Sequence, residues 1–85
     1  MELQQLFEQA VADSKSLSER PSNDTLLQLY SLYKQSTEGD VNIETPSNPF
    51  DFVNKAKYEA WADLKGKSKE TVMQDYINLI GKLKG

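Results

Sequence analysis

The chain of 85 residues is 38% hydrophobic and 27% charged, which fits one folded domain and not a disordered segment. Its 13 acidic and 10 basic side chains give a net charge of -3, which argues against a dedicated nucleic-acid binder. The absence of Cys and His excludes disulfides, zinc–cysteine clusters, and Cys-His or Ser-His-Asp catalytic sites. We therefore expect no metal site and no catalytic residue, since no spacing singles out a pair of carboxylates either.

The distribution of apolar residues bears on membranes and on location in the cell. No stretch approaches the ~20 consecutive apolar residues that a membrane-spanning helix needs, so we expect no stable membrane insertion. A secretory signal is not expected, because Glu2 stands where such a signal carries basic residues and no apolar run follows. A cytosolic or organelle-lumen protein is the default, and we take the cytoplasm as the expected location.

The first half of the chain shows helical periodicity twice. The first helix is predicted to end before Pro21, because a residue that precedes proline avoids the helical conformation. Its stripe is formed by Leu3, Leu6, Phe7, Ala10, Val11 and Leu17. A second helix is predicted from Ser22 or Asn23, which are good N-caps, to Gly39 and Asp40. Its wide apolar face consists of Leu26, Leu27, Leu29, Tyr30, Leu32 and Tyr33.

Residues 39–51 carry Gly39, Pro46 and Pro49 and no repeated apolar pattern, so we interpret them as a long connection. A loop of this length is uncommon inside a compact domain and is often functional.

The second half of the chain predicts two more helices. One spans about residues 52–64, with Asp51 or Asn54 as its cap and Gly66 beyond its end. The other begins after Ser68 and has its stripe at Val72, Met73, Tyr76, Leu79, Ile80 and Leu83. The fold class is therefore all-α: a four-helix bundle in one domain (residues 1–85), with the long connection between helices two and three. That connection permits a non-sequential order of helices.

Positive charge gathers around the third helix. Residues 55–69 contain five lysines against Glu59 and Asp63, a net charge of +3 in an acidic protein. This is either a solvated lysine face or a local anion site. Lys57 lies on the apolar stripe of its helix, three and four residues before Ala60 and Trp61, where a solvated lysine need not be. It either snorkels along the edge of the core or binds an anion.

The second helix carries a similar group. Tyr30, Tyr33 and Lys34 are spaced i, i+3 and i+4, so they share one patch. Aromatic faces stack on flat rings, phenols donate hydrogen bonds to phosphate oxygens, and an ammonium supplies charge. The alternative is that both tyrosines are half-buried core residues. The combination predicts a ligand that has an aromatic ring and a phosphate.

The chain resembles the acyl-CoA-binding proteins, small four-helix carriers of long-chain acyl-CoA esters in fatty-acid metabolism. The resemblance covers nearly the whole chain. It rests on residues 30–35 (YSLYKQ), 37–42 (TEGDVN), 55–61 (KAKYEAW) and 64–70 (LKGKSKE), with Met73, Tyr76 and Ile77 following. It implies a monomeric, non-enzymatic protein whose partner is a medium- to long-chain fatty acyl-CoA, a carried ligand and not a cofactor.

The resemblance also implies residue roles. Tyr30, Tyr33 and Lys34 match positions that meet the adenine and ribose 3′-phosphate, and Lys57 matches another phosphate-binding lysine. Lys15 matches a basic position near the nucleotide, and Tyr76 a tyrosine that closes the site. Trp61 matches a buried core residue. The acyl chain is expected in a groove formed by Phe7, Val11, Leu26 and Leu27.

The chain departs from the family pattern near the third helix. Val53 stands where many members carry a ligand-facing lysine, Thr45 replaces a commonly basic residue, and residues 47–50 make the connection one residue longer. These departures concern the phosphate contacts and not the fold.

Three other functions are weighed against a carrier. An acyl carrier protein needs an Asp-Ser-Leu serine at a helix start, whereas Asp13-Ser14 is followed by Lys15 inside the first helix. A helical protein-interaction module would present an exposed apolar patch without paired lysines. An esterase is disfavoured because the chain has no His and no evidently activated Ser.

Overall fold

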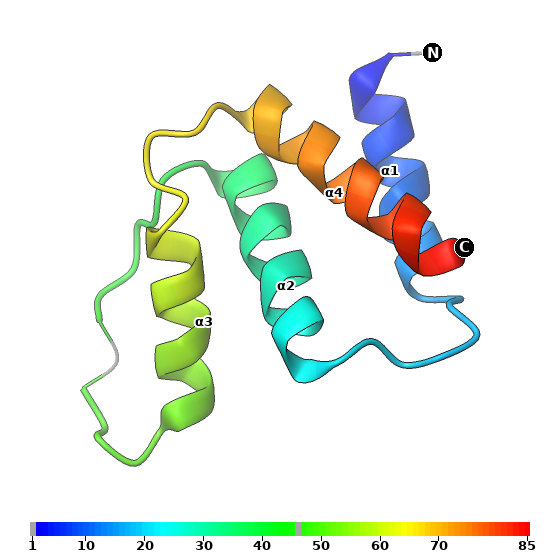
Figure 1. Cartoon of the computed structure of the whole chain (residues 1–85). Coiled ribbons are helices and arrows are strands. Elements are labelled where there is room, and N and C mark those ends of the chain that lie inside the picture. The colour runs from blue at the N-terminus through cyan, green and yellow to red at the C-terminus, as the bar shows by residue number, and fades with distance from the viewer. Residues whose placement is uncertain (1, 46) are drawn as a thin grey trace.

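The computed structural model describes residues 2–45 and 47–85 and contains, in these ranges, four helices and no strand. The helices are α1 (Leu3–Ser14), α2 (Asn23–Glu38), α3 (Phe52–Ala62) and α4 (Lys69–Lys84), shown in Figure 1. The all-α prediction is confirmed, and the longest connection joins α2 to α3. Pro46, which the sequence places in that connection, lies outside the described residues.

Polar caps begin three of the helices where the sequence predicts them. The hydroxyl oxygens of Ser22 and Ser68 accept hydrogen bonds from the amides of Thr25 and Thr71, each at 3.2 Å. The Asp51 carboxylate accepts one from the Asn54 amide at the start of α3. Each cap satisfies an amide that has no partner inside its helix.

Helix α1 ends at Ser14, earlier than its apolar stripe predicts, so Leu17 lies outside it. The hydroxyls of Ser14 and Ser16 donate to the carbonyl oxygens of Val11 and Asp13, at 2.6 and 3.2 Å. Serine hydroxyls that bond nearby backbone in this way compete with continued helix. Helix α3 likewise ends two residues before the predicted limit of residue 64, in a turn that reaches Gly66 with φ of +91°.

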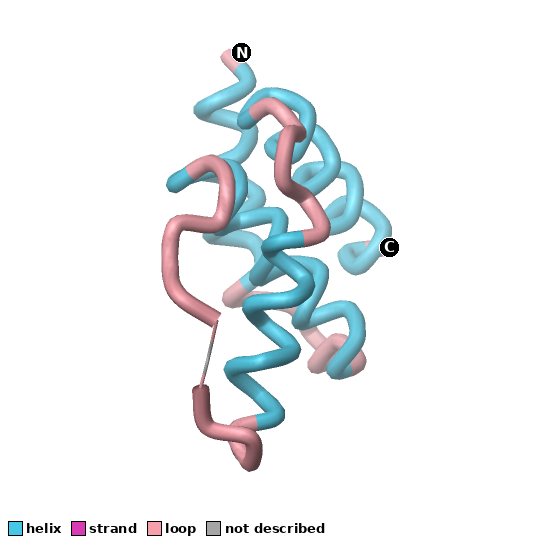
Figure 2. Tube along the Cα trace, turned by 90° about the vertical axis from the view of Figure 1, so that its left-hand side faces the viewer, coloured by secondary structure: helices cyan, strands magenta, loops and turns pink. Residues whose placement is uncertain are grey.

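The connection between α2 and α3 returns the chain to the end at which α2 began (Figure 1, Figure 2). As a result α2 and α3 run in the same direction, while α1 and α4 run in the opposite one. Helix α4 packs against both α1 and α2, and α3 packs against α2. A simple up-down-up-down order is therefore not the one adopted. None of the helices within residues 2–45 and 47–85 is both long and apolar enough to cross a bilayer.

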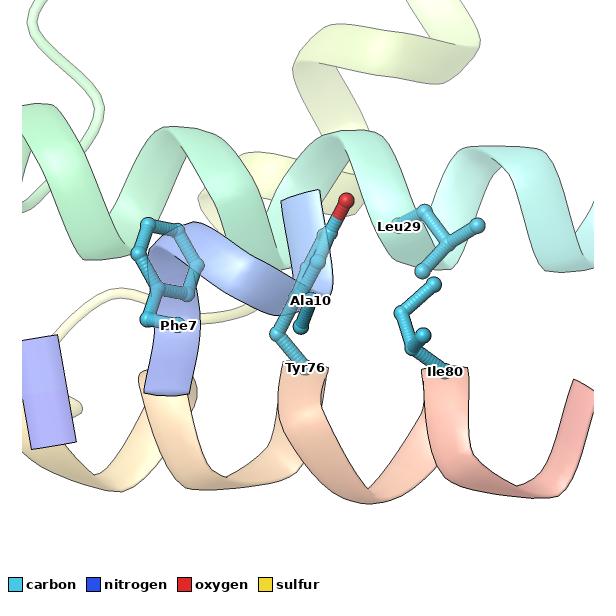
Figure 3. Packing of buried hydrophobic residues seen from close by; sticks show 5 residues of the cluster. All are labelled: Phe7, Ala10, Leu29, Tyr76 and Ile80. Atoms are coloured by element: carbon cyan, nitrogen blue, oxygen red, sulfur yellow. The ribbon is translucent and has the colours of Figure 1, made fainter. Parts of the chain in front are cut away.

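The main core lies where α1, α2 and α4 meet. Figure 3 shows that α1, α2 and α4 all supply side chains to this cluster, which consists of Phe7, Ala10, Leu29, Tyr76 and Ile80. Trp61 of α3 is also fully buried, and its Nε1 donates a hydrogen bond of 2.9 Å to the Gly39 carbonyl oxygen. This bond ties the end of α3 to the end of α2, as expected for a packing residue.

A buried polar group joins the end of α2 to the turn between α3 and α4. Gln35 has 0% exposed surface, and its Nε2 donates to Asp40 Oδ1 at 2.9 Å and to the Lys67 carbonyl oxygen at 3.0 Å. Asp40 Oδ1 also accepts a hydrogen bond of 2.8 Å from the Gly66 amide. We call Gln35, Asp40, Gly66 and Lys67 the Gln35 cluster. Hydrogen bonds from Gly66 and then Gln35 hold the pKa of Asp40 below its usual value.

Candidate ligand-binding site

A pocket of about 650 Å³ lies between the N-terminal halves of α2 and α3, within the size range of small-molecule sites. It is lined by Arg20, Asn23, Leu26, Leu27, Tyr30, Phe52, Val53, Ala56 and Lys57. Because α2 and α3 are parallel, both helices begin at the same end of this pocket. Each start also carries an acidic residue, because Asp24 lies in the first turn of α2 and the Asp51 carboxylate caps α3, and these charges offset the partial positive charges of the two helix N-termini.

Two lysines gather at the other end of the pocket, around the ring of Tyr30. The Lys57 Nζ lies 5.3 Å from the ring centroid of Tyr30, and the Lys34 Nζ lies 6.0 Å from the same centroid. Lys34 also lies 5.7 Å from the ring of Trp61. An ammonium near an aromatic face is stabilised by the ring quadrupole. The geometry thus brings together one aromatic surface and two positive charges from two helices, which suits a ring that carries a phosphate.

The two lysines differ in their state in the free protein. Lys34 forms an ion pair with Glu38 at 2.8 Å, and the hydrogen bond to Glu38 raises the pKa of Lys34. Neither of the ion pairs recorded in the described ranges involves Lys57. An anionic ligand therefore shares Lys34 with Glu38, whereas Lys57 has no recorded ion-pair partner.

The two other tyrosines expected at the site lie outside the pocket lining. Tyr33 is 40% exposed, and its ring stacks on Phe7 with centroids 6.1 Å apart. Tyr76 is 4% exposed and packs edge-on against Phe7 in the main core, with the two ring centroids 5.2 Å apart. Burial raises the pKa of the Tyr76 phenol. Figure 3 shows Tyr76 reaching from α4 into the core beside Ala10.

The expected acyl groove is divided between two places. Leu26 and Leu27 line the pocket, whereas Phe7 is buried in the main core and Val11 packs against that core. Lys15 is exposed just beyond α1, and no recorded contact joins it to the pocket. The structure thus brings Tyr30, Lys34, Lys57, Leu26 and Leu27 together at the pocket. The other expected residues lie outside the pocket lining.

The pocket also contains residues that the sequence did not single out as ligand-binding. Phe52, Val53 and Ala56 are such residues, and their spacing of five, four and one positions before Lys57 could have placed them on the same helical face as that lysine. Arg20 lies in the irregular segment before α2, where no periodic signal exists. No group of acidic side chains in the described part of the chain is arranged to hold a metal ion.

Residues 4–80 match the family model described as acyl CoA binding protein. The chain belongs to the acyl CoA binding protein family. Within this family it is 46% identical to the acyl-CoA-binding protein of Saccharomyces cerevisiae, over 93% of this chain and 90% of that protein. It is 47% identical to acyl-CoA-binding domain-containing protein 1 of Oryza sativa subsp. japonica, over 98% of this chain and 90% of that protein.

Solved structures of the family confirm the fold. The crystal structure of acyl-CoA-binding protein 2 from Oryza sativa matches with a TM-score of 0.89 and 40% identity, over 96% of this chain and 90% of that one. The family member from Moniliophthora perniciosa matches with a TM-score of 0.88 and 37% identity, over 98% and 80% of the two chains.

The family domain also occurs within larger proteins. The chain is 48% identical to rat enoyl-CoA delta isomerase 2 over 94% of its own length but spans only 20% of that protein. The likeness therefore concerns one part of the isomerase.

Proposed function

We propose that this protein is a non-catalytic, monomeric carrier of medium- to long-chain fatty acyl-CoA esters in the cytoplasm, built as one acyl-CoA-binding domain. The observation that carries the proposal is the combination of a pocket with apolar walls and two lysine ammoniums that lie within 6.0 Å of the centroid of the Tyr30 ring in its lining. A long-chain acyl-CoA has the matching parts, an apolar tail and a strongly anionic nucleotide. Family membership supports this choice.

In the proposed complex the nucleotide stacks near Tyr30 and Tyr33, and its ribose phosphate is bound by Lys34 and Lys57. Lys57 contributes more than Lys34, because the Glu38 carboxylate partly offsets the charge of Lys34. Lys15, which is exposed, approaches the phosphates from the solvent side.

The acyl chain is proposed to lie on Leu26 and Leu27 and to continue toward Phe7 and Val11. Contact with Phe7 requires a local rearrangement, since only 2% of its surface is exposed. Tyr76 closes the inner side of the site through its packing on Phe7.

The energetics require both halves of the ligand. Burying a methylene stabilises by up to ~0.8 kcal/mol, so a dozen contribute nearly ten before the cost of ordering the chain. Charge-assisted hydrogen bonds from lysine to phosphate add ~1.5–3 kcal/mol each. Sequestration of this kind needs no nucleophile and no acid–base pair.

One competing function is disfavoured by the structure. Ser14, the only serine that follows an aspartate, is the last residue of α1, and its hydroxyl donates to the Val11 carbonyl oxygen. A serine in this position does not resemble the exposed helix-start serine that carries a phosphopantetheine arm.

Calorimetric titration with coenzyme A, palmitate and palmitoyl-CoA tests the proposal. Palmitoyl-CoA is expected to bind one-to-one and far more tightly than either part alone. Palmitate binding as tight as that of palmitoyl-CoA would show that no site for the nucleotide exists.

Two variants locate the nucleotide site. Lys57→Ala is expected to lose ~1.5–3 kcal/mol of binding free energy, or roughly ten- to a hundredfold in affinity. Lys55→Ala, the matched control, removes an exposed lysine of the same helix that does not line the pocket and is expected to bind as the natural chain does. Equal affinities of the two variants would contradict the role of Lys57.

A further inference from the structure

All charged side chains that line the pocket are positive. Arg20 and Lys57 are its two ionisable cations, and no carboxylate lines it, although acidic residues outnumber basic ones 13 to 10 in the chain. The ion pairs recorded for residues 2–45 and 47–85 are Lys34–Glu38 and Lys84–Asp13, so Arg20 takes part in neither. A cation without a carboxylate partner leaves its field available to a ligand.

The two cations lie at opposite ends of the pocket. Arg20 precedes the first residue of α2 by three positions, on the side where α2 and α3 both begin. Lys57 of α3 lies beside Tyr30 of α2. Tyr30 follows Asn23, the first residue of α2, by seven positions, a distance of ~10 Å along the helix axis. Lys34 approaches the same ring as Lys57, so these two lysines converge on one anionic group. The anion that Arg20 serves must therefore be a different one.

We propose that Arg20 binds the diphosphate of the acyl-CoA, while Lys34 and Lys57 bind the ribose phosphate; this assignment rests on the function proposed above. A guanidinium presents a planar fork of donors that fits two phosphate oxygens at once. The nucleotide then lies across the mouth of the pocket, between Arg20 at one end and Lys57 at the other.

Two ligands separate the two phosphate sites. Palmitoyl-CoA carries the diphosphate and the ribose phosphate, whereas 3′-dephospho-palmitoyl-CoA keeps only the diphosphate. Arg20→Gln is expected to weaken the binding of both ligands by the same factor, roughly threefold to tenfold because Arg20 is exposed. Lys57→Gln is expected to weaken the binding of palmitoyl-CoA strongly and the binding of the dephospho ligand far less.

Three further measurements serve as controls for this comparison. Lys55→Gln removes the same charge outside the pocket and is expected to bind both ligands like the natural chain. Arg20→Lys keeps the charge but loses the fork, so its affinity is expected between those of the natural chain and Arg20→Gln. The melting temperature of Arg20→Gln is expected to be unchanged, since no ion pair or side-chain hydrogen bond of Arg20 is recorded in the described ranges.

The outcomes distinguish this proposal from the function on which it rests. Failure of the natural chain to bind palmitoyl-CoA would overturn the proposed function itself. If the natural chain binds palmitoyl-CoA and Arg20→Gln has the same affinity as Lys55→Gln, only the role proposed for Arg20 is wrong. If the effect of Arg20→Gln disappears with the dephospho ligand, Arg20 binds the ribose phosphate, and its assignment to the diphosphate is wrong.

Discussion

The substitution Gln35→Glu should strongly destabilise the protein. It replaces the Nε2 donor, which lies 2.9 Å from Asp40 Oδ1 and 3.0 Å from the Lys67 carbonyl oxygen, by a carboxylate oxygen in a site with 0% exposed surface. Both hydrogen bonds are lost, at ~0.5–1.5 kcal/mol each. A buried charge without a partner costs ~3–5 kcal/mol. We therefore expect the free energy of unfolding to fall by at least ~3 kcal/mol, out of a total of ~4–13 kcal/mol for a domain of this size.

Thermal and urea unfolding at neutral pH measure this effect. A loss of ~3 kcal/mol corresponds to a fall in melting temperature of ~12–24 °C for a small domain. Gln28→Glu is the matched control, because Gln28 is exposed on the same helix and the same charge is introduced. That control is expected to change stability by no more than ~0.5 kcal/mol.

The pH dependence gives a second criterion. In the variant, burial and Asp40 raise the pKa of the new carboxyl in the folded state, so its destabilising effect is fully present above that pKa and fades as pH falls toward ~4.3, the unfolded value. In the natural chain the folded pKa of Asp40 is lowered, so its stabilising contribution is lost as pH falls from the unfolded value of 3.8 through the folded one. The difference in unfolding free energy between Gln35→Glu and Gln28→Glu should thus become smaller as the pH is lowered. A melting temperature of Gln35→Glu close to that of the control at neutral pH would refute this account of the Gln35 cluster.

Two further predictions concern the core and the rim of the pocket. Trp61→Ala should lower the unfolding free energy by ~3–5 kcal/mol in urea, because it empties a fully buried site, whereas Tyr33→Ala should mainly weaken palmitoyl-CoA binding, by ~1–3 kcal/mol in calorimetry. The reverse pattern would mean that the core and binding residues have been exchanged. Val53→Lys should tighten binding by up to ~1 kcal/mol at low salt, with a gain that shrinks as salt rises, and should leave the melting temperature unchanged because Val53 is 64% exposed. A lowered melting temperature without tighter binding would contradict the placement of the nucleotide beside Val53.

The helices could be predicted because their signals are local. Ser22, Asp51 and Ser68 stand where caps are needed, and each is followed by a stripe of helical period. The end of α1 was placed too late, since Leu17 continues the stripe although the backbone has already turned away. The common direction of α2 and α3 was permitted by the long connection but not predicted, because the direction of packing depends on contacts between distant residues.

The candidate site was predictable only where it coincides with helical faces. The spacing of Tyr30 and Lys34 placed them on one patch, and the position of Lys57 on an apolar stripe marked it as unusual. Periodicity could not separate Leu26, which lines the pocket, from Phe7, which is buried in the core, because both are apolar residues on a stripe. Arg20 gave no signal, since an irregular segment has no face to assign.

The packing of α3 on a single neighbour has a consequence for local opening of the structure. Helix α4 packs on two helices, whereas α3 packs on α2 alone, and its first turns expose Phe52 and Val53. An element with few buried contacts opens at a lower free energy than the rest of its domain. The amides of α3 should therefore exchange with deuterium sooner than those of α4. A ligand that contacts both α2 and α3 across the pocket would raise the free energy needed to open α3 and slow that exchange. Binding would then stabilise the least firmly packed helix of the domain.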